Sequence, residues 1–272
     1  MKIAICTLAI NDWYFDIVRY CVKTIENYAK LHKYDFFICN DIYDGKRDYP
    51  WYKILGIQKI LVQYDYVVWI DADCHVMRPE LSVDYFMNNY MYNYDLLCTK
   101  DWNCTLNTGM MILRNTPFVH ALLELVWTNK EPFDEKFHEQ ASMGQIYDSN
   151  RLESRSKIRV LPIEEQHVFY SYWTNYRPNR SFLFHAARCS HDPLGFIYTV
   201  DCYCPIPMDE DEPGEFTKRL EWLNDEAEII KDIEDCIKTG NRFNKSSRCK
   251  LYDQKFYCEN MMEKIAKTKF QK

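Results

Sequence analysis

The sequence predicts an α/β fold with a largely parallel sheet, because strand-like and helix-like segments alternate along the chain. Residues 66–70 form a continuous apolar run, as expected of a strand buried on both faces. Apolar residues in 14–28 recur three and four positions apart, as expected of an amphipathic helix. With 272 residues, 47% of them hydrophobic and 27% charged, the chain can bury a sizeable core, which rules out wholesale disorder.

Apolar spacing also separates the other helices from the strands. Residues three and four apart predict helices, and short apolar runs predict strands. The second helix begins after Pro50, and Gly240 closes the last one. In chain order, the pattern predicts a strand at 2–8, a helix at 14–28, a strand at 34–39, a helix at 54–61, strands at 66–70, 95–99 and 108–113, helices at 118–127 and 138–147, strands at 158–161 and 182–184, and a helix at 216–237.

Charge is distributed unevenly, although the net charge is only −6. Residues 205–240 hold 12 acids and 4 bases, whereas residues 241–272 hold 9 bases and 3 acids. We therefore expect a main domain at 1–201 and a C-terminal helical extension at 202–272 that packs on it, with the basic tail over the acidic helix. The tail could instead contact nucleic acid or an anionic membrane. Its interleaved aromatic residues favour packing, so no nucleic-acid partner is expected.

Composition excludes several classes of protein. Only 7 glycines occur, and neither a dinucleotide-binding loop nor a P-loop is present. No apolar stretch is long enough to span a membrane, and no signal peptide is recognisable. The 12 cysteines are therefore expected to be free thiols in a reducing compartment, and the chain is expected to be cytoplasmic.

The sharpest motif is Asp71-Ala72-Asp73, which directly follows the buried strand at 66–70. Ligands of open parallel sheets bind beyond the carboxyl ends of the strands. If the chain turns after Asp71, both carboxylates can reach one Mg²⁺ or Mn²⁺ ion, which prefers oxygen ligands and can bridge to substrate phosphates. The alternative is two solvated acids in a turn. The buried strand before them favours the metal site.

A glycine beside an asparagine marks the start of the predicted strand at 108–113. Gly109 would let the backbone approach a ligand, and the amide of Asn107 would contact a sugar hydroxyl. The alternative is a plain turn that enters a strand. The two residues alone leave both interpretations open.

These motifs occur in the order of a known family. Over most of residues 1–190 the chain resembles glycosyltransferase family 34, which contains fungal α-galactosyl- and mannosyltransferases and plant xyloglucan α-xylosyltransferases. The stretches that carry the resemblance are 20–21 with 32–37, Trp51-Tyr52-Lys53-Ile54, the D-x-D motif, 107–115, Glu139-Gln140, 170–173, and His185 with Cys189.

The resemblance implies a GT-A type fold, a Rossmann-like mixed sheet flanked by helices. It also implies metal-dependent, retaining transfer of a hexose or pentose from a nucleotide diphosphate sugar to a glycan acceptor. The implied cofactors are Mn²⁺ or Mg²⁺ and a nucleotide sugar, with a UDP-sugar favoured over a GDP-sugar.

Site roles carry over by position. Asp71, Asp73 and His185 would bind the metal, and Lys53 would contact the diphosphate. Asn107 and Gly109 would line the donor sugar, and Glu139 with Gln140 would lie near the anomeric carbon or the acceptor. Taken alone, His185 is more simply a core or surface histidine than a metal ligand, and Lys53 could be a solvated helix lysine.

The chain departs from the family pattern at three positions. His138 replaces an acid before the Glu-Gln pair, Arg188 replaces a glycine, and Ser190 replaces a lysine. Arg188 can supply the missing cation to the diphosphate. Same-face attack by the acceptor, with the leaving phosphate oxygen as base, is the favoured route, and a covalent intermediate on Glu139 is the alternative.

Two other functions stay open. Because His138 and Ser190 depart from the pattern, the chain could be a non-catalytic protein that binds nucleotide sugars or glycans. A phosphohydrolase that uses the D-x-D motif is the second, although His75 occupies the fifth place, where such enzymes usually have Thr or Val. A further cluster has zinc-capable side chains at Cys189, His191, Cys202 and Cys204, but without the usual spacing.

Overall fold

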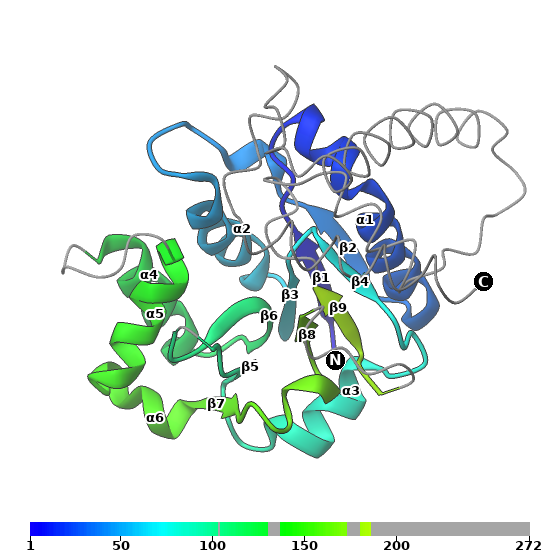
Figure 1. The fold of residues 1–272 in the computed structure, drawn as a ribbon. Coiled ribbons are helices and arrows are strands. Elements are labelled where there is room, and N and C mark those ends of the chain that lie inside the picture. The colour runs from blue at the N-terminus through cyan, green and yellow to red at the C-terminus, as the bar shows by residue number, and fades with distance from the viewer. Residues whose placement is uncertain (103, 130–136, 173–179, 186–272) are drawn as a thin grey trace, which may run out of the picture. The chain divides into compact units, whose positions relative to one another are not determined.

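The computed structural model describes residues 1–102, 104–129, 137–172 and 180–185, all within one compact unit (Figure 1). The expected domain boundary after 201, the extension at 202–272, its helix at 216–237 and its basic tail lie outside the described residues. Arg188 and the Cys/His cluster at 189–204 lie outside them as well. No helix in the described part has the length and hydropathy needed to cross a membrane.

Strands and helices alternate as predicted over the described residues. The strands are β1 (Ile3–Thr7), β2 (Asp35–Ile38), β3 (Tyr66–Ile70), β4 (Cys74–Val76), β5 (Leu96–Thr99), β6 (Asn107–Arg114), β7 (Ile158–Leu161), β8 (Ser171–Tyr172) and β9 (Leu183–His185). The helices are α1 (Asp12–His32), α2 (Tyr52–Leu61), α3 (Val83–Phe86), α4 (Pro117–Thr128), α5 (His138–Asp148) and α6 (Ser154–Lys157). Shorter helical turns are η1 (Asn40–Ile42), η2 (Tyr49–Trp51), η3 (Met87–Met91, a π-helical turn), η5 (Arg151–Glu153) and η6 (Gln166–Val168).

The main sheet is mixed, as the family resemblance implies, rather than largely parallel. Its strand order is β2-β1-β3-β6-β5-β7. Strands β1 and β2, β1 and β3, and β5 and β7 pair in parallel. Strand β6 runs antiparallel to both of its neighbours, β3 and β5. Apolar runs do not reveal strand direction, so the reversal of β6 was not predictable from them.

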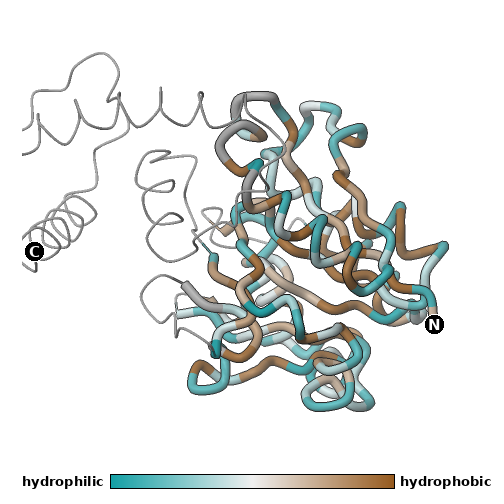
Figure 2. The backbone as a smooth tube through the Cα atoms, turned by 90° about the vertical axis from the view of Figure 1, so that its right-hand side faces the viewer, coloured by the Kyte–Doolittle hydropathy of each residue, from teal (hydrophilic) through white to brown (hydrophobic). Residues whose placement is uncertain are grey.

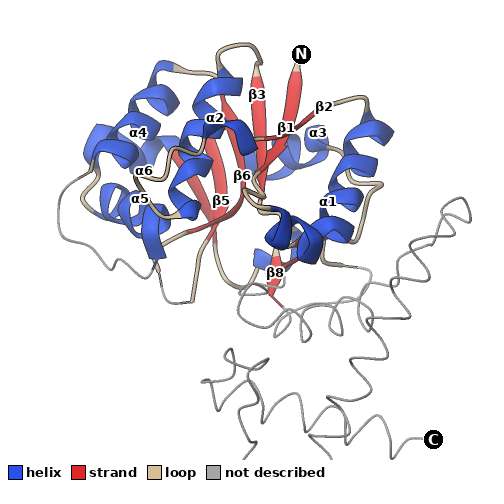
Figure 3. Ribbon diagram, turned by 90° about the horizontal axis from the view of Figure 1, so that it is seen from above, coloured by secondary structure: helices blue, strands red, loops and turns tan. Residues whose placement is uncertain are grey.

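Helices cover both faces of this sheet. Figure 3 shows α2, α4 and α5 on one side of the strands and α1 and α3 on the other. Hydrophilic and hydrophobic stretches alternate along the helical coils, as amphipathic helices require (Figure 2). Along β3, Val67 and Trp69 pack into the core under α2 and α4, whereas Val68 and Ile70 pack into the core under α1 and α3. Burial on two faces explains why β3 is apolar throughout.

Helix ends follow their sequence signals. Asn11 precedes α1, and its side chain accepts a hydrogen bond from the backbone N–H of Tyr14 at 2.7 Å. Thr116 caps α4 in the same way, through Val119 N–H at 3.4 Å. The turn η2 contains Pro50 and leads into α2. Because α2 begins at Tyr52, Lys53 lies in its first turn, and its side chain reaches Asp71 at the end of β3.

A second, three-stranded sheet has the order β4-β9-β8. Strand β9 runs antiparallel beside β4, and Figure 1 shows the two strands side by side. Their register places Cys74 opposite His185. The sequence did not predict β4 and β8, because three and two residues are too few for a periodic pattern. This small sheet brings β9 against the chain that leaves β3.

Candidate functional site

The candidate site lies where β3 ends and β6 begins. Because these strands are antiparallel, Asp71 after β3 lies opposite Gly109 near the start of β6, and its N–H donates to the Gly109 carbonyl at 2.8 Å. The first turns of α2 and α5 supply Lys53 and Glu139, and the end of β9 supplies His185. Five elements, spread between residues 52 and 185, therefore meet at one edge of the sheet.

Lys53 is the centre of a buried charge cluster. Its ammonium Nζ lies 2.9 Å from Asp71 Oδ1 and 3.0 Å from Glu139 Oε1. It also donates to the hydroxyl and carbonyl oxygens of Thr108, at 3.2 and 3.3 Å. Only 5% of Lys53 and 2% of Glu139 is exposed to solvent. Two carboxylates thus share one buried cation.

The electrostatics keep Lys53 charged. Burial alone lowers the pKa of Lys53, but the charges and hydrogen bonds of Asp71 and Glu139 outweigh it, so the pKa is raised above its ordinary value. The indole N–H of Trp69 also donates to Asp71 Oδ1, at 2.6 Å. Oδ1 of Asp71 is therefore committed to protein donors, whereas Oδ2 has no hydrogen bond or ion pair with the described residues.

The start of α5 is tied to β6 through Thr108. The Thr108 hydroxyl donates to Glu139 Oε1 at 3.0 Å, and the Thr108 N–H donates to Gln140 Oε1 at 3.0 Å. Oε2 of Glu139 is buried and has no hydrogen-bond partner among the described residues. His138 lies next to this pair with φ at 48°, and its Nδ1 is 3.6 Å from Asp48 Oδ2. Among the described residues, the cluster thus holds only one of the two carboxylate oxygens of Glu139.

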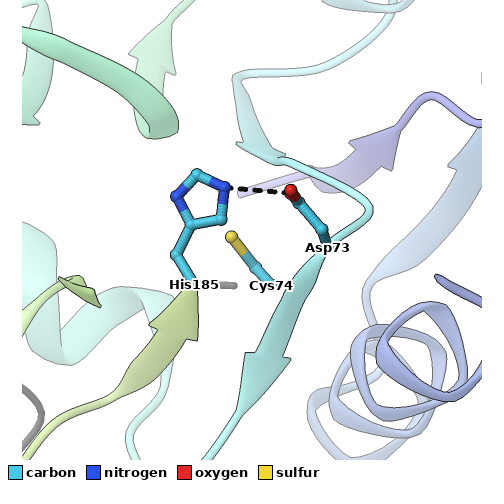
Figure 4. A group of neighbouring side chains, drawn as sticks. All are labelled: Asp73, Cys74 and His185. Carbon is cyan, nitrogen blue, oxygen red and sulfur yellow. Dashed lines mark ion pairs between the residues drawn. The ribbon is translucent and has the colours of Figure 1, made fainter. Parts of the chain in front are cut away.

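A second pair forms beside this cluster. His185 Nε2 lies 3.0 Å from Asp73 Oδ1 (Figure 4). The His185 ring packs edge-on against Tyr170, with ring centroids 5.0 Å apart. Burial lowers the pKa of His185. The charge of Asp73, the hydrogen bond to Asp73 and the charge of Asp71 raise this pKa by more than burial lowers it, so it lies above its ordinary value of 6.5.

Asn107 and Gly109 have structural partners of their own. The amide of Asn107 donates to Asp101 Oδ2 at 2.9 Å, and its oxygen accepts from Gly109 N–H at 2.8 Å. A Cβ at Gly109 would lie 2.8 Å from Cε2 of Tyr170, closer than real Cβ atoms approach. Glycine is thus needed here so that Tyr170 can pack against β6. The predicted contacts of both residues with a donor sugar stay predictions.

The residues present fit a divalent cation. Asp73 offers a carboxylate oxygen and His185 an imidazole nitrogen at one point, a mixed oxygen and nitrogen set that Mn²⁺ accepts. Asp71, the third predicted ligand, faces Lys53 with Oδ1 and lies outside the group of potential metal ligands that contains Asp73 and His185. The sequence did not single out Trp69 or Thr108 as participants. Position was the only signal, since both lie within two residues of a predicted site residue.

Comparisons with known proteins add to this geometry. A family model described as "Protein of unknown function, DUF273" matches residues 25–142. No curated protein matches the chain. Among solved structures, a glycosyltransferase involved in the glycosylation of the major capsid of PBCV-1 aligns over 73% of this chain and 99% of its own, with a TM-score of 0.60 and 14% identity.

Two further solved structures align with lower scores. Mouse xyloside xylosyltransferase 1 aligns over 69% of this chain and 98% of its own, at a TM-score of 0.44 and 9% identity. Drosophila β1,4-galactosyltransferase 7, in a complex with manganese, UDP-Gal and xylobiose, aligns over 70% of this chain and 73% of its own. Its TM-score is 0.41 and its sequence identity is 13%. The similarity to the PBCV-1 enzyme, at 14% identity, confirms the fold of this chain, a GT-A type mixed sheet flanked by helices.

Replacing Lys53 by Met is expected to destabilise the protein by about 3 to 5 kcal/mol, because the buried Glu139 and the partly buried Asp71 would be left without a counter-charge. Lys59→Met on the same helix is the matched control, since Lys59 is 56% exposed and pairs with the exposed Asp41. The control should cost less than about 1 kcal/mol. Urea unfolding of both variants measures the difference. Equal losses would show that the Lys53 cluster is not a buried charge network.

Gly109→Ala should destabilise the protein by about 1 to 3 kcal/mol, because the new methyl group overpacks against Tyr170. Gly144→Ala is the control, since a Cβ there would lie 3.6 Å from Thr105, an ordinary contact. The control lies inside α5 and should be neutral or stabilising by about 0.5 to 1 kcal/mol. Thermal and urea unfolding test both. A Gly109→Ala protein as stable as the control would contradict the packing described for Tyr170.

The His185–Asp73 pair should make metal-free stability depend on pH. Since the folded-state pKa of His185 is raised above 6.5, its contribution is complete below pH 6.5 and is lost as pH rises through the folded pKa. His185→Gln should remove this loss, and His120→Gln, at a histidine remote from the site, should not. Melting temperatures of the three proteins from about pH 5 to about pH 9 test this. Parallel curves for the wild type and His185→Gln would contradict it.

Proposed function

We propose that the chain is a metal-dependent, retaining glycosyltransferase that moves a hexose or pentose from a nucleoside diphosphate sugar to a glycan acceptor. The observation that supports this most is the buried Asp73–His185 pair beside Asp71, at the edge of a GT-A type sheet where ligands of such sheets bind. The resemblance to glycosyltransferase family 34 supports the retaining outcome and a UDP-sugar as donor.

Asp73 and His185 would hold Mn²⁺ or Mg²⁺, with Asp71 Oδ2 as a third ligand or as an acceptor for the ribose. The cation, when bound, neutralises the negative charge that develops on the departing diphosphate. Carboxylate and imidazole ligands leave coordination positions for phosphate oxygens, as substrate-binding metal sites require. The chain's own task is to hold these ligands in a buried setting, which the small sheet accomplishes by pairing β4 with β9.

Lys53 takes a different part from the one that the family resemblance implies. Its ammonium is already bound by Asp71, Glu139 and Thr108, and it is 5% exposed. It therefore acts as a counter-charge that orients the two carboxylates, and cations other than Lys53 would contact the diphosphate. Arg188 stays the predicted residue for that contact.

Glu139 and Gln140 would face the donor sugar. Lys53 and Thr108 hold Oε1 of Glu139, so Oε2 is the oxygen left to accept a sugar hydroxyl or to stabilise positive charge at the anomeric carbon. The hydrogen bonds and ion pair on Oε1 withdraw electron density from the carboxylate, which makes it a weaker nucleophile. This favours same-face attack by the acceptor over a covalent intermediate on Glu139.

Asp73→Asn should abolish Mn²⁺-dependent binding of the nucleotide sugar without unfolding the protein. A ligand at 100 times its Kd adds about 2.7 kcal/mol of stability, so thermal shift with Mn²⁺ and a panel of UDP- and GDP-sugars detects binding. Asp84→Asn, which alters an exposed acid in α3, is the control and should keep the full shift. An unchanged shift in Asp73→Asn would remove the metal assignment.

Product analysis tests the reaction itself. Incubation of the full chain with Mn²⁺, the sugar donor found by thermal shift and an oligosaccharide panel should yield a product with the donor's anomeric configuration, as read by NMR. Inversion would contradict the retaining proposal. Tight donor binding with neither transfer nor hydrolysis would show a non-catalytic binding protein instead.

A further inference from the structure

The cation site contains a third potential ligand that the sequence motifs did not suggest. Cys74 follows Asp73 directly and pairs with His185 across the β4–β9 ladder, so both side chains lie on the same face of the small sheet. Figure 4 shows its sulfur beside the His185 ring, next to the Asp73–His185 ion pair. One ligand atom from each residue, Asp73 O, Cys74 Sγ and His185 N, lies within 4.8 Å of the other two, and all three residues are buried.

These separations suit a tetrahedral ion. With zinc bonds of about 2.0 to 2.3 Å to nitrogen, oxygen and sulfur, tetrahedral ligand atoms lie about 3.3 to 3.8 Å apart. Asp73 Oδ1 and His185 Nε2 are already 3.0 Å apart, so side-chain adjustments on the order of 1 Å would complete the set. The Cys74 thiol makes only a long hydrogen bond, 4.0 Å, to the Gly109 carbonyl among the described residues, and little is lost by recruiting it.

Charge balance also favours the thiolate. The Cys74 side chain is fully buried, where an uncompensated charge is costly. One carboxylate and one thiolate neutralise a divalent cation, which gives an electrically neutral centre inside the protein. On binding, the S–H bond breaks, its proton passes to solvent, and a sulfur–metal bond forms with no change in oxidation state.

We propose that Cys74 is a third protein ligand of the Asp73–His185 site when the cation is thiophilic, so that the site takes zinc or cadmium through oxygen, nitrogen and sulfur. Sulfur ligands select for such ions and discriminate against Mn²⁺, which binds through Asp73 and His185 without the thiol. Three protein ligands leave one open position, the arrangement of a substrate-binding rather than a closed structural zinc site.

This inference deepens the proposed function and rests on its Asp73–His185 site. Zinc should bind the full chain more tightly than Mn²⁺, and it should displace Mn²⁺ from the site. Metal binding is measured without nucleotide sugar and without turnover. Failure of the glycosyltransferase proposal and failure of the Cys74 proposal therefore give different results.

Cadmium titration of the full-length protein provides the test, because a cadmium–thiolate bond gives an ultraviolet charge-transfer band. We expect the band of the wild type to saturate with one cadmium equivalent more than that of Cys74→Ser, because other cysteines of the chain can also bind cadmium. Cys98→Ser is the matched control, since Cys98 is also fully buried in a strand but lies outside this group, and it should keep that equivalent. Zinc affinity by competition with a chelator dye should fall by about tenfold or more in Cys74→Ser, with Mn²⁺ affinity changed by less than about threefold.

A second variant covers the case in which Cys74→Ser does not fold, as judged by circular dichroism. His185→Ala keeps every cysteine and should still lose that cadmium equivalent, because two ligands remain of three. The proposal is wrong if Cys74→Ser binds as many cadmium equivalents, and zinc as tightly, as Cys98→Ser, or if folded His185→Ala titrates as the wild type does. Loss of that cadmium equivalent with intact Mn²⁺-dependent donor binding in Cys74→Ser supports both proposals together.

Discussion

The site depends on the ion pairs of the buried Lys53 ammonium with Asp71 and Glu139. The ammonium bridges Asp71 after β3, Thr108 on β6 and Glu139 on α5, so the ends of three elements are held by one cation. Ion pairs of this kind do not by themselves guarantee stability, since removing two carboxylates and an amine from water is costly. The ion pairs of Lys53 instead fix the positions of the two carboxylates. The carboxylates cannot move away from Lys53 without leaving a charge unpaired in the interior, so their positions are set before any ligand arrives.

The second constraint is the pairing of β4 with β9. Residues 73 and 185 are separated by more than a hundred positions, and a loop of that length costs entropy to close. Hydrogen bonds of the ladder and burial of Val76, Leu183 and Phe184 offset that cost and bring the Asp73 carboxylate to the His185 imidazole. Tyr170, packed against both Gly109 and His185, links this pair to β6. The charge cluster of Lys53 and the Asp73–His185 pair are therefore supported from the same strand.

Asn107 and Gly109, both predicted to contact the donor sugar, have structural contacts within the protein. Asn107 is held by Asp101 and by Gly109, and Gly109 is required by Tyr170. These contacts explain an asparagine and a glycine at the start of β6 without any ligand. These contacts are compatible with the proposed function, because a rigidly held backbone can also form one side of a sugar-binding site. Asp73, His185 and Glu139 are therefore the residues that support the proposed function most directly.

Much of this protein follows from its sequence alone. Apolar spacing located every predicted helix and strand within the described residues, because burial on one or two faces imposes a period on the chain. The D-x-D motif pointed to the candidate site, because its place after a buried strand puts it at the edge of the sheet where ligands are expected to bind. Tertiary structure decided the rest: the reversal of β6, the pairing of Cys74 with His185, and the partners of Lys53. Those depend on strand direction, register and long-range contacts, and none of these leaves a periodic trace in a single sequence.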